Sequence, residues 1–446
     1  MIRTLCYATA FGLVALSPAL AQRTTPPDSP RKPAATQAAA KAPARPVASF
    51  WTSPEPTFDE HTYDRINAAM LSYSAIEVRG GWPAVAKVNL APGEKGADVA
   101  KLRQRLAITD DLPAELADGD GYDQMLTEAV KRFQARHGLP ETGVVGPQTV
   151  EALNVPVKDR IRQLAASLDR LQEMGFTFGQ RYVVVNIPAA VAEAVENGRV
   201  ARRYVTVVGK TDRPSPTLTT QINAVNLNPT WTVPLSIVKK DIVPKMRKDP
   251  NYAARMNMKL LDAQGNEIDA RSIDWNSERT PNFTIRQDSG DSNALGNVRI
   301  DMPNPYSVYM HDTNHRNLFS ADYRFQSSGC TRVQDVRDLA AWILKDNAGW
   351  SRKEIDAEIA TQKRTTVRLA HGIPVAWIYL TGWASPDGTI NFRNDVYGLD
   401  NAAKPFVASV ERPVRVSAAR ASGFVLQSDD PEPPLTFTPV SYLDSR

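Results

Sequence analysis

The chain has 446 residues, 42% of them hydrophobic, which is enough for roughly two to four domains with sizeable cores. Its formal net charge is +4, and basic and acidic residues are interspersed without a dense basic stripe. This pattern excludes nucleic acid as the expected partner, and it is compatible with an anionic polymer.

Residues 1–21 have the form of a secretory signal rather than a membrane anchor. Arg3 precedes an apolar run that ends in Ala19-Leu20-Ala21, the small-x-small pattern that a signal peptidase accepts. The run is about 15 residues long, whereas a helix that crosses a bilayer needs about 20. No later stretch is apolar enough to span a membrane. We therefore expect export, cleavage and no stable membrane insertion of the mature chain.

Residues 22–47 are rich in Pro, Ala and Thr and contain no aromatic residue. Such a segment cannot bury enough apolar surface to offset the entropy lost on ordering, so we expect a disordered linker. Structure is expected to begin near Phe50 and Trp51, in an N-terminal scaffold segment over residues 48–89.

Residues 90–156 carry the pattern of a compact helical unit. A first helix is expected after Gly96, with Asp98 as its cap and with apolar positions at Val99, Leu102 and Leu106. A Gly/Asp-rich loop leads to a second helix, and a Gly-Pro turn leads to a short third helix. The Phe133-Gln134 pair and the turn Thr142-Gly143-Val144-Val145-Gly146 closely resemble the three-helix peptidoglycan-binding domain. The resemblance implies a unit that binds cell-wall glycan.

Residues 157–179 contain Ile161, Leu164, Leu168 and Leu171 on one helical face, which predicts a connecting helix. From Arg181 the pattern changes to short segments rich in β-branched residues, and Asn197-Gly198 is a strong hairpin signal between two of them. Residues 181–238 and 296–311 are mostly strand-like. We therefore expect a mainly-β region over residues 180–384.

Residues 239–295 interrupt this region and are polar, charged and irregular, so we interpret them as a capping insertion over the sheet. A covering helix is predicted by Val333, Val336, Leu339, Ala340 and Ile343. Residues 385–446 include the Pro-rich stretch SDDPEPP and are expected to form a C-terminal extension that ends in a flexible tail.

One thiol remains in the expected mature chain. The sequence has two cysteines, and Cys6 lies within the signal, which leaves Cys330. Exported proteins usually pair their cysteines, so a single one is either reactive or a buried hydrophobic residue. The count alone favours burial, and the residues around Cys330 reverse that preference.

Residues 306–310 have the pattern of a strand that delivers His311 at its end, and residues 327–332 that of a tight turn into a helix. A thiol needs a base to become a thiolate near neutral pH, and amides at a helix start support the anion. Gly329 has no side chain, so a substrate carbonyl can approach the backbone amides there. Those amides would form an oxyanion hole.

His311, the segment Asp312 to Gln326 and the following Ser-x-Gly-Cys-x-Arg match the signature of L,D-transpeptidases, which share a YkuD-like catalytic domain. Other segments follow in the order seen in the large, YcbB-like Gram-negative members: RYVVVNIP, VVGKTDRPSP, LNPTWTVP, DIVPKMRKDPNY and HDTNHRNLF. The resemblance covers residues 50–400. Smaller members have Ser-His-Gly-Cys where this chain has Ser327-Ser328-Gly329-Cys330, so no second active-site imidazole is supplied there.

The resemblance implies an α+β multidomain fold. It would combine a mainly-β L,D-transpeptidase catalytic domain, which carries an inserted capping subdomain, with a small three-helix peptidoglycan-binding domain. It also implies a periplasmic enzyme of peptidoglycan biosynthesis, cell-wall biogenesis and cell shape, and a carbapenem target. No cofactor and no metal is implied.

By resemblance, the family acylates its cysteine with the third residue of a peptidoglycan tetrapeptide stem and releases D-alanine. The acyl group then passes to an amine, typically that of another stem's diaminopimelate, to give a 3→3 cross-link. On that mapping Cys330 is the nucleophile and His311 the proton acceptor and donor, with Gly329 in the oxyanion hole. The backbone carbonyl that orients His311 would be that of Asp312.

Four more residues are expected at the substrate. Arg332 either positions a substrate carboxylate or braces the loop, and Ser328 belongs to the same turn. Tyr309 and Trp231 are expected to line the cleft, although packing explains these two nearly as well.

Three rival interpretations are weaker. Ser236 and Lys239 match the Ser-x-x-Lys pattern of serine penicillin-binding enzymes, but the companion motifs are absent. His311 and His315 have the spacing of helical zinc ligands, yet the segment favours a loop and no glutamate follows the first histidine. A catalytically dead binding protein would have no need of the His311/Cys330 pair.

Several acceptors remain open, because they would use the same residues. Water as acceptor gives an L,D-carboxypeptidase, and exchange of free D-amino acids or attachment of an outer-membrane protein would proceed through the same acyl-enzyme.

Overall fold

The computed structural model describes residues 49–277 and 282–402. The expected signal, the Pro/Ala-rich linker and the tail beyond residue 402 lie outside the described residues. No helix in the described part of the chain is long and apolar enough to cross a membrane.

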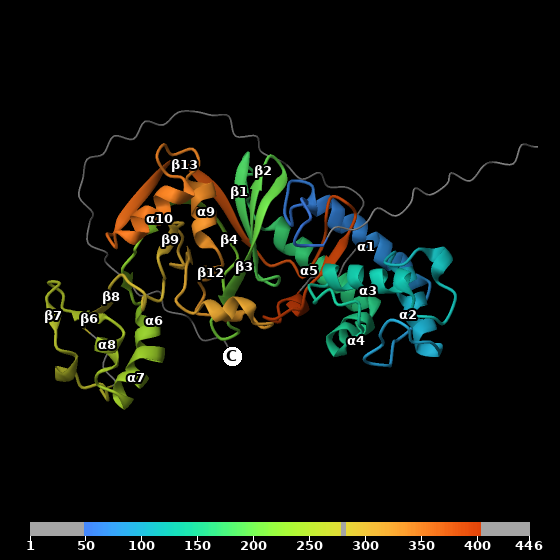
Figure 1. Cartoon of the computed structure of the whole chain (residues 1–446), viewed down its shortest axis with the longest axis horizontal. Helices are drawn as coiled ribbons and strands as arrows, with labels where there is room; N and C mark the ends of the chain where they lie inside the picture. The colour runs from blue at the N-terminus through green and yellow to red at the C-terminus, as the bar shows by residue number, and fades with distance from the viewer. Residues whose placement is uncertain (1–48, 278–281, 403–446) are drawn as a thin grey trace, which may run out of the picture. The chain divides into compact units, whose positions relative to one another are not determined.

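The helical unit contains the three helices expected for residues 90–156, drawn in cyan to green in Figure 1: α2 (Ala97–Ile108), α3 (Gln124–Arg136) and α4 (Pro147–Asn154). The prediction of Asp98 as a helix cap is wrong, because Gly96 is the N-cap residue and Asp98 lies in the first turn. The capping carboxylate belongs to Asp123, which accepts a hydrogen bond from the Leu126 amide at 2.8 Å before α3.

The contacts of Gln134 explain why the Phe133-Gln134 pair and the Thr142–Gly146 turn occur together in this unit. This buried side chain on α3 donates to the Val144 carbonyl at 2.8 Å and accepts from the Gly143 amide at 2.9 Å. The amide therefore ties the Thr142–Gly146 turn to the helix, while Phe133 beside it is fully buried in the core of the unit.

Asp111 and Arg136 form a buried ion pair at the edge of this unit. Arg136 donates to both carboxylate oxygens, at 2.7 and 2.6 Å, and Thr109 donates to one of them at 2.6 Å. Because both side chains are at least 94% buried, each depends on the other for compensation of its charge.

The large sheet has the strand order β11-β3-β12-β10-β9-β4-β13-β1-β2, and β2 also pairs with β3, so the sheet closes on itself. Its strands are β1 (Arg181–Asn186), β2 (Val191–Glu196), β3 (Arg199–Gly209), β4 (Leu218–Leu227), β9 (Val298–Asp301), β10 (Met310–His311), β11 (Phe325–Ser327), β12 (Thr331–Val333) and β13 (Thr365–Ile378). The hairpin predicted at Asn197-Gly198 is confirmed: both residues have positive φ, at 52° and 72°, as a tight β2–β3 turn requires.

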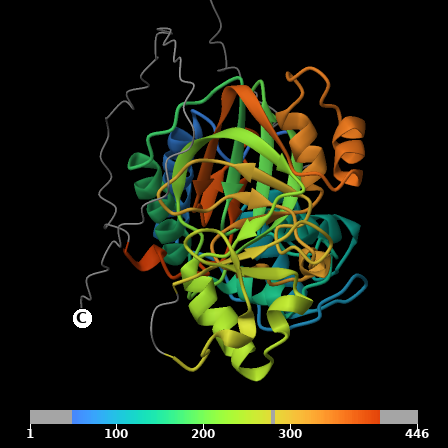
Figure 2. The same ribbon diagram turned by 90° about the vertical axis from the view of Figure 1, so that its left-hand side faces the viewer.

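Two helical layers cover different faces of this sheet. One face packs with α9 (Val336–Ile343) and α10 (Arg352–Ala360) in a single core, which confirms the covering helix predicted after Cys330. The other face, at β1 and β2, packs with α1 (Thr62–Val78) and α5 (Val157–Gln172). Figure 2 shows α9 and α10 in orange on one side of the strands and α5 in green on the other.

The C-terminal part of the described chain belongs to this packing. Strands β14 (Gly382–Ala384) and β15 (Ile390–Phe392) form a two-stranded sheet, and Phe392 is buried in the core that contains α1 and α5. Two 3₁₀ turns, η4 (Arg316–Ser320) and η5 (Asp400–Ala402), and one in the helical unit, η1 (Ala114–Leu116), complete the elements outside the insertion.

The insertion is a folded subdomain, although its sequence pattern is irregular. It has a four-stranded sheet in the order β5-β8-β6-β7 and its own apolar core around Trp275 and Ile285. It also begins before residue 239, because β5 starts at Trp231. Its elements are β5 (Trp231–Thr232), α6 (Leu235–Ile237), the π-helical η2 (Val238–Ile242), α7 (Val243–Lys248), α8 (Tyr252–Arg255), β6 (Met258–Leu261), β7 (Glu267–Ile268), η3 (Ala270–Ser272) and β8 (Thr284–Gln287).

The buried ion pair predicts a large loss of stability in Asp111→Ala. The substitution leaves the Arg136 charge buried without a carboxylate, so the free energy of unfolding should fall by about 3 kcal/mol in chemical denaturation. Asp118→Ala, in an exposed loop of the same unit, is the control and should change stability by less than about 0.5 kcal/mol. Equal stability of the two variants would contradict the pair's role.

The insertion predicts tolerance to excision. Its two ends are adjacent, because the Asn228 amide donates to the Asn297 carbonyl at 2.9 Å, and its core is separate from those of the sheet. Replacement of residues 231–292 by a short Gly/Ser linker should leave a cooperatively folded chain, measured by circular dichroism and thermal unfolding. A non-cooperative or aggregated product would show that the insertion is part of the catalytic core.

Candidate active site

Pairing of two short strands brings the expected catalytic residues together. β10 pairs with β12 in parallel, with Met310 opposite Thr331 and His311 opposite Arg332, and the Thr331 amide donates to the Tyr309 carbonyl at 3.1 Å. Because side chains alternate along a strand, Met310 and Thr331 share one face of the sheet. Tyr309, His311, Cys330 and Arg332 therefore share the other.

The strand before His311 is shorter than the sequence predicts. Only Met310 and His311 belong to β10, because the Asn304 side chain organises the preceding residues into a turn. Its Oδ1 accepts from the Tyr306 and Val308 amides, and Ser307 has φ 53°. The strand predicted over residues 306–310 is thus wrong in length, while His311 does stand at a strand end.

The turn before Cys330 is held by two serine hydroxyls. Ser327 Oγ donates to the Cys330 carbonyl at 2.5 Å and accepts from the Gly329 amide at 3.2 Å. Ser215 Oγ donates to the Gly329 carbonyl at 2.7 Å and accepts from the Gly209 amide. Gly329 has φ +112°, a backbone conformation that other residues rarely adopt, so a glycine is required there.

Cys330 does not stand at a helix start, contrary to the sequence prediction. The residues after it form β12, and α9 begins only at Val336. Burial raises the pKa of Cys330, and the Tyr309 backbone, which hydrogen-bonds to the sulfur, opposes that rise. The backbone amide of Cys330 has no acceptor among the described residues.

This arrangement shifts the expected oxyanion hole by one residue. The Gly329 amide already has an internal acceptor in Ser327 Oγ, whereas the Cys330 amide is open with respect to the described residues. The Cys330 amide is therefore the donor that a developing oxyanion can engage without breaking a hydrogen bond.

His311 is oriented by a backbone carbonyl. Its Nδ1 lies in hydrogen-bonding contact with the carbonyl oxygen of Asp312, the contact expected from the family resemblance. Because a carbonyl only accepts, Nδ1 carries the proton and Nε2 is left as the basic nitrogen. Asp312 is itself buried and accepts from the Asn297 amide at 3.1 Å, which fixes the loop after β10.

The thiol and the imidazole are both neutral at rest. Burial lowers the pKa of His311 to about 3, with help from the positive charges of Arg332 and Arg299, while the Asp312 hydrogen bond opposes the shift. Burial raises the pKa of Cys330 to about 11, which the Tyr309 backbone and the same two arginines oppose. Proton transfer from sulfur to Nε2 is therefore driven by substrate attack rather than completed beforehand.

Arg332 lies beside the reacting pair without a carboxylate of its own. It forms neither an ion pair nor a side-chain hydrogen bond with any described residue, and its Nε is buried without a partner. Within the described chain, then, no polar contact of this side chain braces the loop. The geometry favours the other interpretation, in which Arg332 offers its charge to a substrate carboxylate.

The remaining expected residues differ in position. Tyr309 packs edge-on to His311 with ring centroids 5.6 Å apart and lies beneath Arg299, so it borders the pair directly. Trp231 belongs to the insertion, packs against its core and hydrogen-bonds with the Tyr309 side chain. Ser328 is exposed, and its hydroxyl accepts from Arg213 at 3.0 Å.

Ser215, Ser327 and Arg299 are functional candidates that the sequence analysis did not name. Ser327 precedes the Gly329 turn by two residues, and a serine beside a glycine turn is a signal for a backbone brace. Ser215 lies six residues after Gly209 and carries no such local signal. Arg299 gave no such signal, because only the β9–β10 pairing places it opposite His311.

The rival motifs do not assemble a site. His315 is exposed and precedes the η4 turn, while His311 is buried. Ser236 and Lys239 lie in the insertion. Within the described ranges, no group of three or more His, Cys, Asp or Glu side chains is placed to hold a metal ion.

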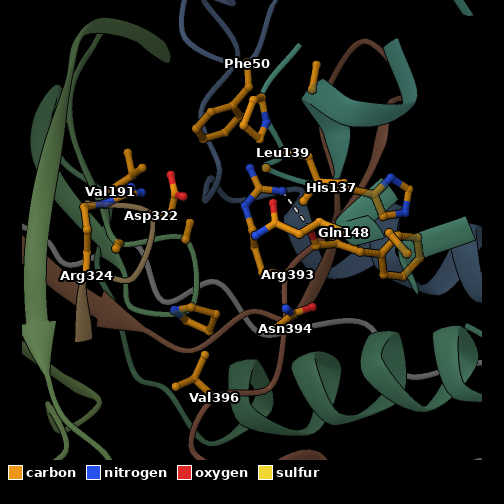
Figure 3. A pocket seen from close by; sticks show the side chains of 18 of the residues that line it. Phe50, His137, Leu139, Gln148, Val191, Asp322, Arg324, Arg393, Asn394 and Val396 are labelled. Atoms are coloured by element: carbon orange, nitrogen blue, oxygen red, sulfur yellow. Dashed lines mark hydrogen bonds between the residues drawn. The ribbon is translucent and has the colours of Figure 1, made fainter. Parts of the chain in front are cut away.

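A cavity of about 530 Å³ lies where the helical unit meets the sheet (Figure 3). Arg393 and Asn394 point into it from the segment after β15, with Phe50 and His137 around them. Neither Cys330 nor His311 lines it. Arg393 donates to the Arg136 carbonyl at 3.0 Å and lies over the Phe50 and Trp383 rings, so this cavity is a packing junction separate from the thiol.

Sequence comparison identifies both units. Residues 180–369 match the family described as the L,D-transpeptidase catalytic domain, and residues 95–153 match a "putative peptidoglycan binding domain". A protein named "Putative L,D-transpeptidase" from Haemophilus influenzae is 36% identical over 220 residues, 49% of this chain and 44% of that protein. The chain thus matches less than half the length of this curated relative.

Solved L,D-transpeptidases are more distant. One from Mycobacterium smegmatis is 17% identical, with 44% of this chain and 58% of that chain covered and a TM-score of 0.23. One from Stackebrandtia nassauensis is 14% identical, with 66% and 96% covered and a TM-score of 0.26. Both scores are low, so the assignment depends on the sequence matches. On these matches, residues 180–369 are an L,D-transpeptidase catalytic domain, preceded at residues 95–153 by a peptidoglycan-binding domain.

Proposed function

We propose that the protein is a periplasmic L,D-transpeptidase that forms an acyl-enzyme on Cys330 and transfers the acyl group to an amine, giving 3→3 cross-links in peptidoglycan. The observation that carries the proposal is the neutral Cys330/His311 pair on one face of paired strands, beside an unengaged Cys330 amide. The periplasmic location is supported by the signal-like residues 1–21.

In the donor half-reaction, the sulfur attacks the carbonyl of the third stem residue while its proton passes to His311 Nε2. The Cys330 amide donates to the oxyanion of the tetrahedral intermediate. The resulting imidazolium, held by the Asp312 carbonyl, gives its proton to the leaving nitrogen of D-alanine. The C–N bond breaks, and a thioester remains on Cys330.

In the acceptor half-reaction, an amine attacks the thioester carbonyl and loses a proton to Nε2. The second tetrahedral intermediate collapses with the C–S bond broken, and the sulfur recovers the proton from the imidazolium. Arg332 lies close enough to both side chains to influence their charge, and its unpaired guanidinium would hold a carboxylate of the peptide.

The test of the function is incubation of the purified protein with a disaccharide tetrapeptide, followed by mass spectrometry. A dimer that lacks one D-alanine is expected, and the same experiment with Cys330→Ala should give neither dimer nor thioester. Product that consists only of tripeptide would replace transpeptidation by carboxypeptidation, and unchanged tetrapeptide would contradict both.

Covalent labelling tests the nucleophile itself. A carbapenem carbonyl resembles the donor bond, so intact mass should show one adduct on the wild type and none on Cys330→Ala. Thr217→Ala, at an exposed position just before β4, is the control and should label like the wild type. An adduct on Cys330→Ala would contradict the assignment of the nucleophile.

The two pKa values predict a broad pH plateau. Between about pH 5 and 9 the free protein keeps both groups neutral, because His311 protonates near 3 and Cys330 ionises near 11. The acylation rate constant with a carbapenem should therefore change little across this range. In Arg332→Gln a positive charge that lowers the His311 pKa is removed, so the acid limb should move to higher pH. A rate that rises about tenfold per pH unit from 6 to 8 would indicate that only the small ionised fraction of Cys330 reacts, without proton transfer to His311, and would contradict the scheme.

A further inference from the structure

The sheet face that carries Cys330 continues past the reacting pair as a row of polar side chains. Register places Arg332 opposite His311, His311 opposite Arg299, Arg299 opposite Asn226, and Asn226 opposite Thr366. Paired residues project from the same face, so these five side chains cross β12, β10, β9, β4 and β13 in one line.

A second line runs beside the first and ends in a positive charge. Asp301 on β9 pairs with Ala224 on β4, and Ala224 pairs with Arg368 on β13, on the same face as Cys330. From β12 to β13 there are four steps between strands, which is about 19 Å along the sheet. No helix of the α1/α5 layer covers this half, since that layer packs on β1, β2 and the end of β13.

A cavity of about 630 Å³ occupies this part of the face. Tyr309 and Arg299 line its end nearest the thiol, and Arg364, Thr366 and Arg368 line its far end. Thr230 and Thr232, where the insertion begins, also contribute to its lining. Cys330 and His311 do not line this cavity, but Tyr309, which packs against His311, does, so the cavity lies next to the reacting pair.

The charges of its lining are unbalanced at the far end. Arg299 is neutralised by Asp301, with a 2.6 Å contact, and Asp301 also accepts from Asn226 at 2.6 Å. Arg364 and Arg368 are exposed, and neither forms an ion pair or a side-chain hydrogen bond with a described residue. Two free guanidinium groups beside a polar cavity fit a carboxylate, which they bind with paired N–H donors.

We propose that Arg364 and Arg368 bind a carboxylate of the acceptor peptide, the molecule whose amine attacks the acyl group on Cys330. The inference rests on the proposed function. Distance favours the acceptor: the three donor residues up to the reacting carbonyl reach about 10 Å when extended, short of β13. An acceptor that attacks through a side-chain amine adds the length of that side chain to its backbone, so it reaches farther along the cavity from Cys330 than the donor does.

The test compares the wild type with the double variant Arg364→Gln/Arg368→Gln in transfer from a tetrapeptide donor. Two synthetic acceptors are used, a peptide amine with a free C-terminal carboxylate and the same peptide as a carboxamide. The double variant should raise KM for the carboxylate acceptor about tenfold and leave KM for the carboxamide near the wild-type value. Arg199→Gln, at an exposed arginine in the β2–β3 hairpin that forms no ion pair with a described residue, is the matched control and should behave as the wild type.

The possible outcomes separate the two proposals. Acyl-enzyme formation from donor alone, followed by intact mass, serves as the reference for each variant. If acyl-enzyme formation falls in the double variant as much as transfer does, the arginines bind the donor, and the inference is overturned. The inference is also overturned if the double variant changes KM equally for both acceptors, or changes it for neither. Absence of acyl-enzyme in the wild type would instead overturn the proposed function.

Discussion

The parallel contact between β10 and β12 is the constraint on which the rest of the site depends. Each strand contributes only two or three residues, and their register decides which side chains meet. A shift by one residue would turn His311 towards the α9 core and leave Cys330 without a base. The Ser327 and Ser215 hydroxyls and the Asn304 turn can be understood as the means by which such short strands are held in register.

The layers of the molecule explain why this face is the one left open for the proposed reaction. Helices α9 and α10 fill one side of the sheet, and α1 and α5 cover the other only near β1 and β2. The uncovered half lies over β12, β10, β9 and β4, where polar residues replace the apolar rows found elsewhere. The insertion starts from the end of β4 and returns at β9, so its position in the chain places it beside this same face.

Local patterns in the sequence were sufficient for several elements. Three of the predicted features depend on contacts between residues near one another in the chain or on a shared motif. They are the helical spacing of α5 and α9, the Asn197-Gly198 hairpin, and the turn that Gln134 ties to α3. The turn before His311 was missed because the β-branched and aromatic residues at 306–310 have strand propensity, which the Asn304 side chain overrides. Arg299, Arg364 and Arg368 could not be selected, since strands far apart in the chain must pair before these residues share a face with Cys330.

The elevated pKa of Cys330 has a chemical consequence beyond acyl transfer. Oxidation of cysteine by peroxides proceeds through the thiolate, so a thiol that stays protonated at neutral pH reacts slowly. The described residues contain no second cysteine with which Cys330 could form a disulfide. On the proposed function, the raised pKa would protect this thiol in the periplasm, because the reactive anion would form only when a substrate carbonyl is there to consume it.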